Sequence, residues 1–342
     1  MKRLFRSIFA LLILLAIAAG AIVTFGYYEY TSPTQNPAQV ILIAKGTSLN
    51  KTAADLSQKN LITSPFWFKF FARIQGKEKD LKTGEYQIPA NASAKDITDI
   101  IISGATIVHK ITFKEGLTSS DIVKELSAIN NLSGTIASIP ENGTLLPETY
   151  HYSYGDSRQD ILSRAQKTFT TEAEKLWENH KASAPIESFA KAKVLASMIE
   201  REAVTAAERP IIASVFINRL KKGMKLQSDP TVIFSVTGGS FDLDRPLVYK
   251  DLETKSPYNT YIHKGLPPKP ICNFGLDSLR AALNPATTDY LYFVVNPDNP
   301  TEHLFAKTYE EHQQNTAKFL KFKRAERKKL RLKKAATPQS QN

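Results

Sequence analysis

The chain has 342 residues, of which 42% are hydrophobic, so it is long enough for two or three globular domains and is not disordered throughout. Its net charge of +12 lies at the two ends: Lys2, Arg3 and Arg6 supply three positive charges, and the segment from Lys318 to Lys334 supplies nine more. The middle of the chain is therefore neutral, which argues against a nucleic-acid-binding face on the folded part.

The first predicted element is a membrane span. Ile8–Phe25 carries no charge and is followed by interfacial tyrosines, which predicts a transmembrane helix over residues 8–28 behind a cytoplasmic basic tip of residues 1–7. A cleaved signal peptide is the alternative, although the apolar run is longer than the usual about 7–15 residues. The basic residues stay inside, so we expect a single-pass protein of the inner (cytoplasmic) membrane with the bulk of the chain outside the cytoplasm.

A repeated pattern follows a short polar linker. Residues 40–60 and 108–126 each read as a β-branched strand, a Lys, a Gly turn, a Ser/Thr cap and an amphipathic helix. Between the two copies, residues 84–104 predict a strand, a turn and a helix capped near Ser93. The segment 38–106 is thus a predicted small α+β module, and 107–145 is a second strand–helix unit that links it to the next domain.

The module of residues 38–106 resembles the LysM-like module found beside cell-wall enzymes. The resemblance rests on KGTSLNKTAADL and on the later LKTGEYQI. A spacer without affinity for sugars is an equally good interpretation.

Helices dominate from residue 146 to 320. Residues 157–181 carry an apolar stripe at helical spacing, a second helix is predicted over about 186–208, and a third begins at Pro210 and ends at Gly223. Long loops follow, then one strand over residues 289–296. The predicted fold class is α+β: a mostly helical domain with long loops and a short sheet follows the small module. Loops of this length are usually functional.

The chain ends in a basic segment, which predicts a basic helix that fades into a polar end, with a basic disordered tail over residues 321–342. A solvated end is one interpretation of it, and attraction to anionic lipid or to a polyanionic wall polymer is the other. The single cysteine, Cys272, excludes an intrachain disulfide and is best interpreted as a packed core residue.

The segment LASMIERE places Glu200 and Glu202 two residues apart on the second helix of this domain. Residues i and i+2 point about 200° apart on a helix, so the two carboxylates cannot act on one substrate as a pair. Glu200 has small and apolar neighbours at helical spacing, which would raise the pKa of its carboxyl and keep it protonated as a general acid. This favours Glu200 as the catalytic residue and Glu202 as its support, although a solvated helix surface is the commoner setting for a glutamate.

Five motifs in one order strengthen this interpretation. ASMIEREAVTAAERPIIASVFINRL, MKLQSDPTVIF, SPYNTY, GLPPKPI and LNPATTDYLYFVV together resemble the MltG (YceG-like) family of membrane-anchored endolytic murein transglycosylases. The resemblance covers residues 146–312, with the anchor and the LysM-like module in the expected places.

The resemblance implies roles for individual residues. The catalytic glutamate would be Glu200, the first of the two, with Glu202 supporting it. The substrate-binding groove would contain seven loop residues: Gln227, Ser228, Asp229, Tyr258, Asn259, Thr260 and Tyr261. Asp229 also has the simpler interpretation of a turn or cap residue, and the others that of loop packing. Three departures from the family pattern, Asn142, Lys269 and Phe274, put substrate contacts in doubt more than the chemistry.

The resemblance also implies the reaction. One glutamate would protonate the oxygen that joins N-acetylmuramic acid to N-acetylglucosamine, and then take the proton of the muramoyl C6 hydroxyl as that hydroxyl attacks C1. The product is a 1,6-anhydro end, formed without water, a cofactor or a metal. An ordinary glycosidase needs two carboxylates. The implied partners are glycan strands of nascent peptidoglycan, the membrane and possible peptidoglycan synthases, and the implied result is termination of strand elongation.

Two other functions stay open at this point. A non-catalytic, membrane-anchored peptidoglycan-binding protein would rely on the LysM-like module alone. A membrane-tethered nucleic-acid binder would use the basic tail, but the neutral middle of the chain opposes it. Metal catalysis and a serine nucleophile are poorly supported, because the sequence has neither HExxH nor G-x-S-x-G.

Overall fold

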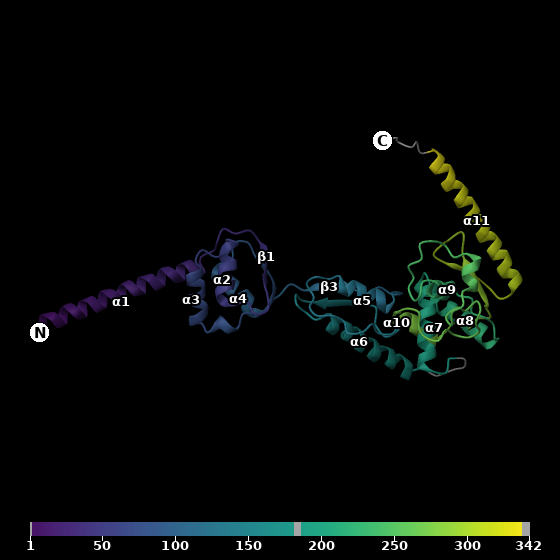
Figure 1. The fold of residues 1–342 in the computed structure, drawn as a ribbon, viewed down its shortest axis with the longest axis horizontal. Helices are drawn as coiled ribbons and strands as arrows, with labels where there is room; N and C mark the ends of the chain where they lie inside the picture. Colours follow the sequence, from purple (N-terminus) through teal and green to yellow (C-terminus); the bar gives the residue numbers. More distant parts are fainter. Residues whose placement is uncertain (1, 181–185, 337–342) are drawn as a thin grey trace. The chain divides into compact units, whose positions relative to one another are not determined.

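The computed structural model describes residues 2–180 and 186–336, which form two compact units (Figure 1). Unit 1 contains the described residues up to 111, together with 130–134 and 151–157. Unit 2 contains residues 112–129, 135–150 and the described residues from 158 onward. The predicted α+β class with an N-terminal apolar helix is confirmed, while the domain boundaries stay predictions.

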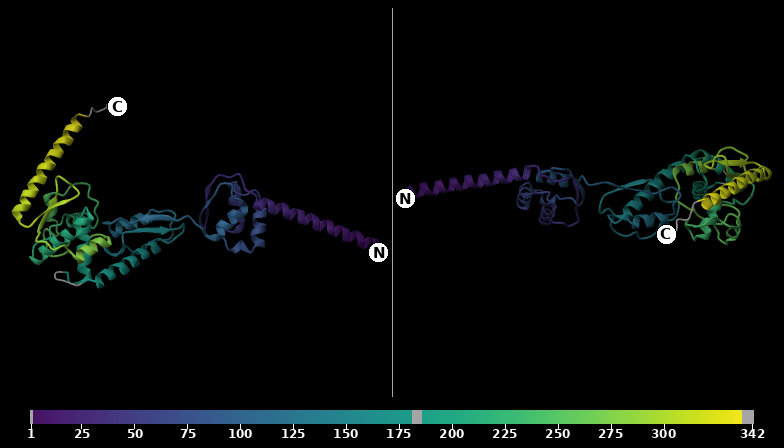
Figure 2. Two further views of the ribbon diagram at one scale, coloured as in Figure 1. Left: turned by 180° about the vertical axis from the view of Figure 1, so that it is seen from behind. Right: turned by 90° about the horizontal axis from the view of Figure 1, so that it is seen from above.

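Unit 1 begins with helix α1 (Lys2–Thr31), which is long and apolar enough to cross a membrane. Its most apolar 18-residue window has a mean hydropathy of 2.8, and none of that window is buried. Only the C-terminal end of α1 packs on the rest of the unit (Figure 2). There Gly26 lies against Trp67, where an added Cβ would come within 2.4 Å of the indole, and Tyr30 stacks on Phe71. The helix suits a membrane anchor or a signal sequence.

The small module of unit 1 has the order strand, two helices, strand, helix. Its elements are β1 (Gln39–Ile43), α2 (Leu49–Gln58), α3 (Pro65–Ile74), the short 3-10 helix η1 (Lys77–Lys79), β2 (Gly84–Ile88) and α4 (Ala94–Ser103). Strands β1 and β2 pair antiparallel from Gln39 opposite Ile88 to Ile43 opposite Gly84. Large side chains such as Phe68, Tyr86 and Ile97 are fully buried beneath them, and each contributes about 1.5–3 kcal/mol by leaving water.

The predicted helix caps of the repeat are confirmed. Ser48 accepts the backbone N–H of Lys51 at the start of α2. Thr118 forms a reciprocal capping box with Asp121 at the start of α5 (Ser119–Ser127). The helix predicted after Ser93 is α4, which Ser93 caps in the same way with Asp96. Strand β3 (His109–Thr112) precedes α5 and pairs with β4 (Thr149–Tyr152).

Unit 2 is built around helix α7 (Phe189–Glu202), which packs on α8 (Arg209–Lys221), α9 (Asp229–Val236) and α10 (Leu276–Leu283) (Figure 1). The Ser188 side chain caps α7, and the helix ends because Ala203 is extended. Seven of the eight residues from Ala192 to Ile199 of α7 are buried. The remaining elements of the unit are α6 (Arg158–Glu178), η2 (Ala206–Glu208), η3 (Tyr249–Glu253), β5 (Tyr292–Val295), β6 (His303–Ala306) and α11 (Tyr309–Ala336).

Several elements of unit 2 differ from the sequence prediction. The second helix stops at Glu202 rather than near Glu208, and two segments interpreted as loops form α9 and α10. The strand over residues 289–296 is half-buried and pairs antiparallel with β6, which was not predicted. The basic C-terminal segment is helical up to Ala336 in α11, so the helix extends beyond residue 321, where the disordered tail was predicted to begin. Residues 337–342 lie outside the described part.

Candidate active site

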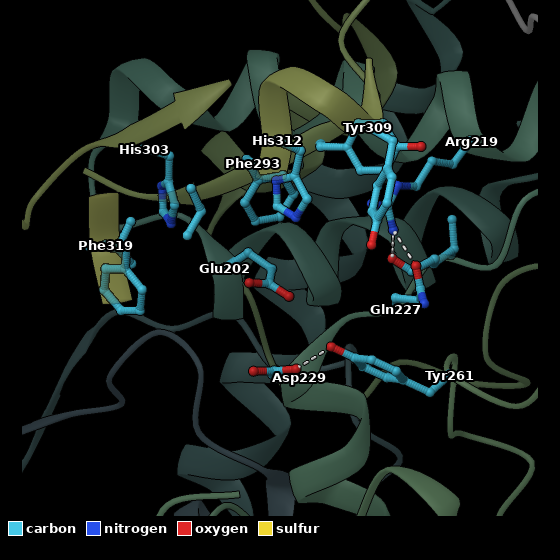
Figure 3. A pocket seen from close by; sticks show the side chains of 14 residues that line it. Glu202, Arg219, Gln227, Asp229, Tyr261, Phe293, His303, Tyr309, His312 and Phe319 are labelled. Atoms are coloured by element: carbon cyan, nitrogen blue, oxygen red, sulfur yellow. Dashed lines mark hydrogen bonds between the residues drawn. The ribbon is translucent and has the colours of Figure 1, made fainter. Parts of the chain in front are cut away.

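A cavity of about 460 Å³ opens in unit 2 at the C-terminal end of α7 (Figure 3). Glu202, the last residue of that helix, faces into it. The walls come from α8, α9, β5, β6 and α11, together with the loops around Gln227 and Tyr261. The cavity is lined by Glu202, Arg219, Leu226, Gln227, Asp229, Tyr261, Tyr292, Phe293, Val294, Val295, His303, Tyr309, His312 and Phe319. Its size suits a small ligand or a segment of a longer one.

Glu202 is surrounded by protein yet reaches the cavity. The Ser228 hydroxyl donates a hydrogen bond of 2.5 Å to Glu202 Oε1. Burial, reinforced by the negative charge of Asp229, raises the pKa of Glu202 to about 7, against the opposing effects of the Ser228 hydrogen bond and of Arg219. A carboxyl with such a pKa is protonated in a large fraction of molecules near neutral pH, which a general acid requires.

Glu200 faces the opposite side of α7 and is held by an ion pair. Its side chain is 5% exposed; Oε1 accepts a hydrogen bond from Arg209 at 3.3 Å, and Oε2 accepts the backbone N–H of Gly275 at 2.9 Å. Arg209 also pairs with Glu115 at 3.2 Å. Burial and the charge of Glu200 raise the pKa of Glu115. Glu200 does not line the cavity.

The expected settings of the two glutamates are therefore reversed. The prediction gave Glu200 the apolar surroundings and the raised pKa, and treated Glu202 as its support. The structure places Glu202 in the cavity with the raised pKa, and gives Glu200 a cation and a backbone donor. The physical reason is that residues remote in sequence cover each face of α7: Gly275 on one face and Ser228 on the other.

Three of the predicted groove residues line the cavity: Gln227, Asp229 and Tyr261. The Tyr261 hydroxyl donates a 2.6 Å hydrogen bond to Asp229 Oδ1, and burial raises the pKa of that hydroxyl. Gln227 adopts φ = +53°, a left-handed conformation that is rare for a residue other than glycine. Strain of this kind is often found at functional sites.

The other four predicted groove residues, Ser228, Tyr258, Asn259 and Thr260, do not line this cavity, and their substrate-binding roles stay predictions. Asn259 and Thr260 are buried, at 0% and 2% exposed, and their side chains bond within the protein. Asn259 donates to the backbone carbonyls of Leu252 and Thr254, and Thr260 Oγ1 accepts the backbone N–H of Ser228 at 2.9 Å. Buried Ser228 contacts Glu202 instead of lining the cavity, and Tyr258 packs on Phe234.

The three departures from the family pattern also lie away from the cavity. Lys269 is exposed and pairs with Glu141, and Phe274 is fully buried against Phe169. The Asn142 side chain binds the backbone of Ser119 and of Ile271. These positions therefore shape loops rather than the cavity.

Several cavity residues were not predicted as site residues. Arg219 is buried, donates to the carbonyls of Leu291 and Leu226, and lies over the Tyr292 ring at 5.2 Å. It belongs to the quoted FINRL motif, which could have indicated it. His303, Tyr309, His312 and Phe319 come from β6 and α11, where no motif drew attention to them. Among the described residues, no group of three or more metal-binding side chains is suitably placed for a metal ion.

Comparison with known protein families matches residues 41–318 to the YceG-like family. The chain belongs to this family. It is 32% identical over 314 residues to an endolytic murein transglycosylase of Bacillus subtilis, covering 83% of this chain and 85% of the relative. It is 23% identical to an endolytic murein transglycosylase of Streptococcus pneumoniae, covering 82% of this chain but 58% of that longer protein. The predicted family resemblance is thus confirmed.

The fold is also similar to a solved structure. A crystal structure of a yceG-like protein from Listeria monocytogenes matches with a TM-score of 0.51 and 30% sequence identity, covering 81% of this chain and 98% of that one. The YceG-like match spans both units, so it includes the small module of unit 1 as well as the cavity of unit 2.

Proposed function

We propose that this YceG-like protein is an endolytic peptidoglycan lytic transglycosylase, as its Bacillus and Streptococcus relatives are named, and that Glu202 is its catalytic acid. The observation that carries the assignment is the setting of Glu202: a carboxyl in a cavity of about 460 Å³, with a pKa raised to about 7 by burial. Glu200 keeps a structural role, because Arg209 and the Gly275 N–H already satisfy its carboxylate.

The proposed reaction uses Glu202 as the proton donor. Protonated Glu202 gives its proton to the oxygen between N-acetylmuramic acid and N-acetylglucosamine as the C1–O bond breaks. The C6 hydroxyl of the muramoyl residue then attacks C1 and gives its proton to the Glu202 carboxylate, so the 1,6-anhydro ring closes without water and Glu202 is protonated again. Gln227, Asp229 and Tyr261 line the same cavity and are placed to hydrogen-bond sugar hydroxyl and acetamido groups.

The remaining parts of the chain fit a function at the membrane. Helix α1 would anchor the enzyme as a single-pass protein, and units 1 and 2 would lie outside the cytoplasm, where glycan strands are made. Cleavage of nascent strands would terminate their elongation, which makes peptidoglycan synthases the expected partners. The module containing β1 and β2 would act as a LysM-like glycan-binding unit.

Product-end analysis tests the proposal. Detergent-solubilised full-length protein is incubated with purified glycan strands, and the new ends are identified by mass spectrometry. Anhydro-muramoyl ends support a transglycosylase. Reducing ends would make the protein a hydrolase, with Asp229 as the candidate second carboxylate. Binding without any cleavage would instead support a peptidoglycan-binding anchor.

A further inference from the structure

The C-terminal end of α1 is built into the core of the small module that follows it. Gly26 lies against the Trp67 indole of α3, and buried Tyr30 stacks on Phe71 with 4.9 Å between the ring centroids. Figure 1 shows α3 at the end of the module from which α1 projects. Loss of α1 would uncover these aromatic side chains of α3, which favours a helix that is retained over one that is cleaved off.

The polar segment between α1 and β1 is also fixed to the module. Asn36 is buried, and its backbone carbonyl accepts the N–H of Asn91 at 3.0 Å. The Thr34 hydroxyl donates a 2.7 Å hydrogen bond to the Ala92 carbonyl. Because packing and these bonds both join α1 to the module, the module is held beside the end of the helix rather than tethered on a free linker.

Helix α3 carries an apolar stripe on the side that faces away from the core. Phe66, Phe70 and Ile74 follow one another at intervals of four residues and so lie on one face of the helix. Phe66 is 61% exposed, Ile74 is 66% exposed and Phe70 is half-buried, whereas Phe68 and Ala72 on the inner face are fully buried. The outer face of a helix in a water-soluble domain is usually polar. This stripe therefore indicates contact with something outside the module.

The place of the stripe beside α1 indicates what that contact is. The uncharged stretch of α1 runs from Ser7 to Tyr28, and a hydrocarbon core about 30 Å thick takes about 20 residues of helix to cross. Gly26, on which α3 packs, thus lies at the boundary between the bilayer and the water outside. Aromatic side chains are enriched at this depth in membrane proteins.

We propose that α3 lies in the interfacial layer of the membrane and holds the module against the bilayer through Phe66, Phe70 and Ile74. The inference rests on the proposed anchoring by α1 and goes beyond it, because α1 and α3 together form one surface for lipid. Helices that lie in this layer bury an apolar face at the boundary between headgroups and acyl chains. The module then stays at the membrane surface, where the proposed substrate is made.

Two basic residues of α3 suit a lipid surface. Lys69 and Arg73 follow Phe66 and Phe70 by three residues, so their side chains lie beside the stripe. Arg73 pairs with Glu78 at 3.4 Å, but both side chains are about half exposed, and an ion pair in water contributes little. Both cations can therefore meet the phosphates of anionic lipids.

The test places a polarity-sensitive fluorophore on single cysteines of the full-length protein. The labelled variants are Phe66→Cys and Ile74→Cys, in nanodiscs of phosphatidylethanolamine and phosphatidylglycerol that hold one protein each. Val40→Cys is the matched control, because Val40 is an exposed apolar residue of β1, on the side of the module away from α1 (Figure 1). Wild-type protein measures background labelling, since its single cysteine, Cys272, is fully buried.

The labels on Phe66→Cys and Ile74→Cys should emit at shorter wavelength than the label on Val40→Cys. They should also be quenched by lipids that carry a nitroxide near the headgroup and be protected from iodide in the water. Labels as open to iodide as the one on Val40→Cys would overturn the inference, and so would protection that arises only when several proteins share a disc, which would indicate a protein contact.

A label on Ile17→Cys, within the most apolar part of α1, tests the anchoring separately. Nitroxides deep in the acyl chains should quench it. Quenching of this label together with iodide access at Phe66→Cys and Ile74→Cys would overturn the role of α3 and leave the anchor in place. Absence of lipid quenching on Ile17→Cys would overturn the proposed anchoring, and the inference with it.

Discussion

Glu200 and Glu202 lie two residues apart on α7, and their carboxylates bind opposite sets of partners: Arg209 and the Gly275 N–H for Glu200, the Ser228 hydroxyl for Glu202. Glu200 thus joins α7 to α8 and to the start of α10, whereas Glu202 lines the cavity. Since one helix end carries both, substitutions at the two positions should have different consequences.

Replacing Glu200 with Gln should mainly lower stability. The amide keeps an acceptor for the Gly275 N–H but removes the charge that pairs with partly buried Arg209, so we expect the free energy of unfolding to fall by about 1–3 kcal/mol. Urea unfolding measures this loss. At a temperature where the variant is folded, kcat should stay within a few-fold of wild type. A collapse of kcat in a fully folded Glu200→Gln protein would contradict the structural role.

Replacing Glu202 with Gln should have the opposite effect on stability. The folded pKa of about 7 lies above the ordinary value of 4.5, so the folded state binds this proton more tightly than the unfolded state does. Below about pH 4.5 the carboxyl is protonated in both states, and its burial does not change the free energy of unfolding through ionisation. As the pH rises, ionisation lowers the free energy of unfolding of the wild type, by about 3 kcal/mol at pH 7. The variant should gain stability over wild type across that window, measured by unfolding at pH 4, 6 and 8. A difference that is constant with pH would contradict the buried setting.

Removing the Ser228 hydroxyl should move the pH dependence of activity. Its hydrogen bond lowers the pKa of Glu202, so Ser228→Ala should raise that pKa. As an acid, Glu202 must be protonated, and activity falls as pH rises through its pKa. The alkaline limb of kcat against pH should therefore shift to higher pH in Ser228→Ala.

Neutralising Asp229 should shift the alkaline limb of kcat against pH to lower pH. The negative charge of Asp229 raises the pKa of Glu202, so Asp229→Asn should move the alkaline limb to lower pH. Tyr261→Phe is the matched control, because it removes the 2.6 Å hydrogen bond to Asp229 and leaves the charge in place. Equal shifts in the two variants would show that the charge is not the cause.

The left-handed backbone of Gln227 predicts a contrast between two truncations. Glycine adopts φ = +53° without strain and alanine does not, so Gln227→Gly should be more stable than Gln227→Ala by about 1 kcal/mol. Both variants remove the side chain from the cavity, and both should raise KM. Thermal unfolding and steady-state kinetics measure the two effects. Equal stabilities would argue against stored strain at this position.

The sequence predicted elements with strong local signals. Ser93 and Thr118 are flanked by the patterns of capping boxes, and the helices they begin were placed within a residue or two. Helix α3 was missed although its sequence carries a helical signal: Pro65 suits the first turn, and the buried residues Phe68, Phe71 and Ala72 lie at helical spacing. Helix α9 was missed because its segment was interpreted as part of a long loop, although Pro230 suits the first turn of a helix.

The site itself needed three-dimensional information. Helical spacing places Glu200 and Glu202 on different faces, but the partners that decide their roles come from up to 75 residues away. His303 has an unremarkable sequence context, and its pairing with Glu208 spans 95 residues. Gln227 and Asp229 could be predicted from their motif, whereas the burial of Asn259 beside them depends on the packing of a loop.

The most direct test of the central claim compares Glu202→Gln with Glu200→Gln in one assay of anhydro-end formation, with both proteins shown to be folded. The account predicts that Glu202→Gln abolishes the anhydro ends and that Glu200→Gln still forms them at a rate near wild type. The reverse pattern would return the catalytic role to Glu200 and contradict the assignment of the cavity as the active site.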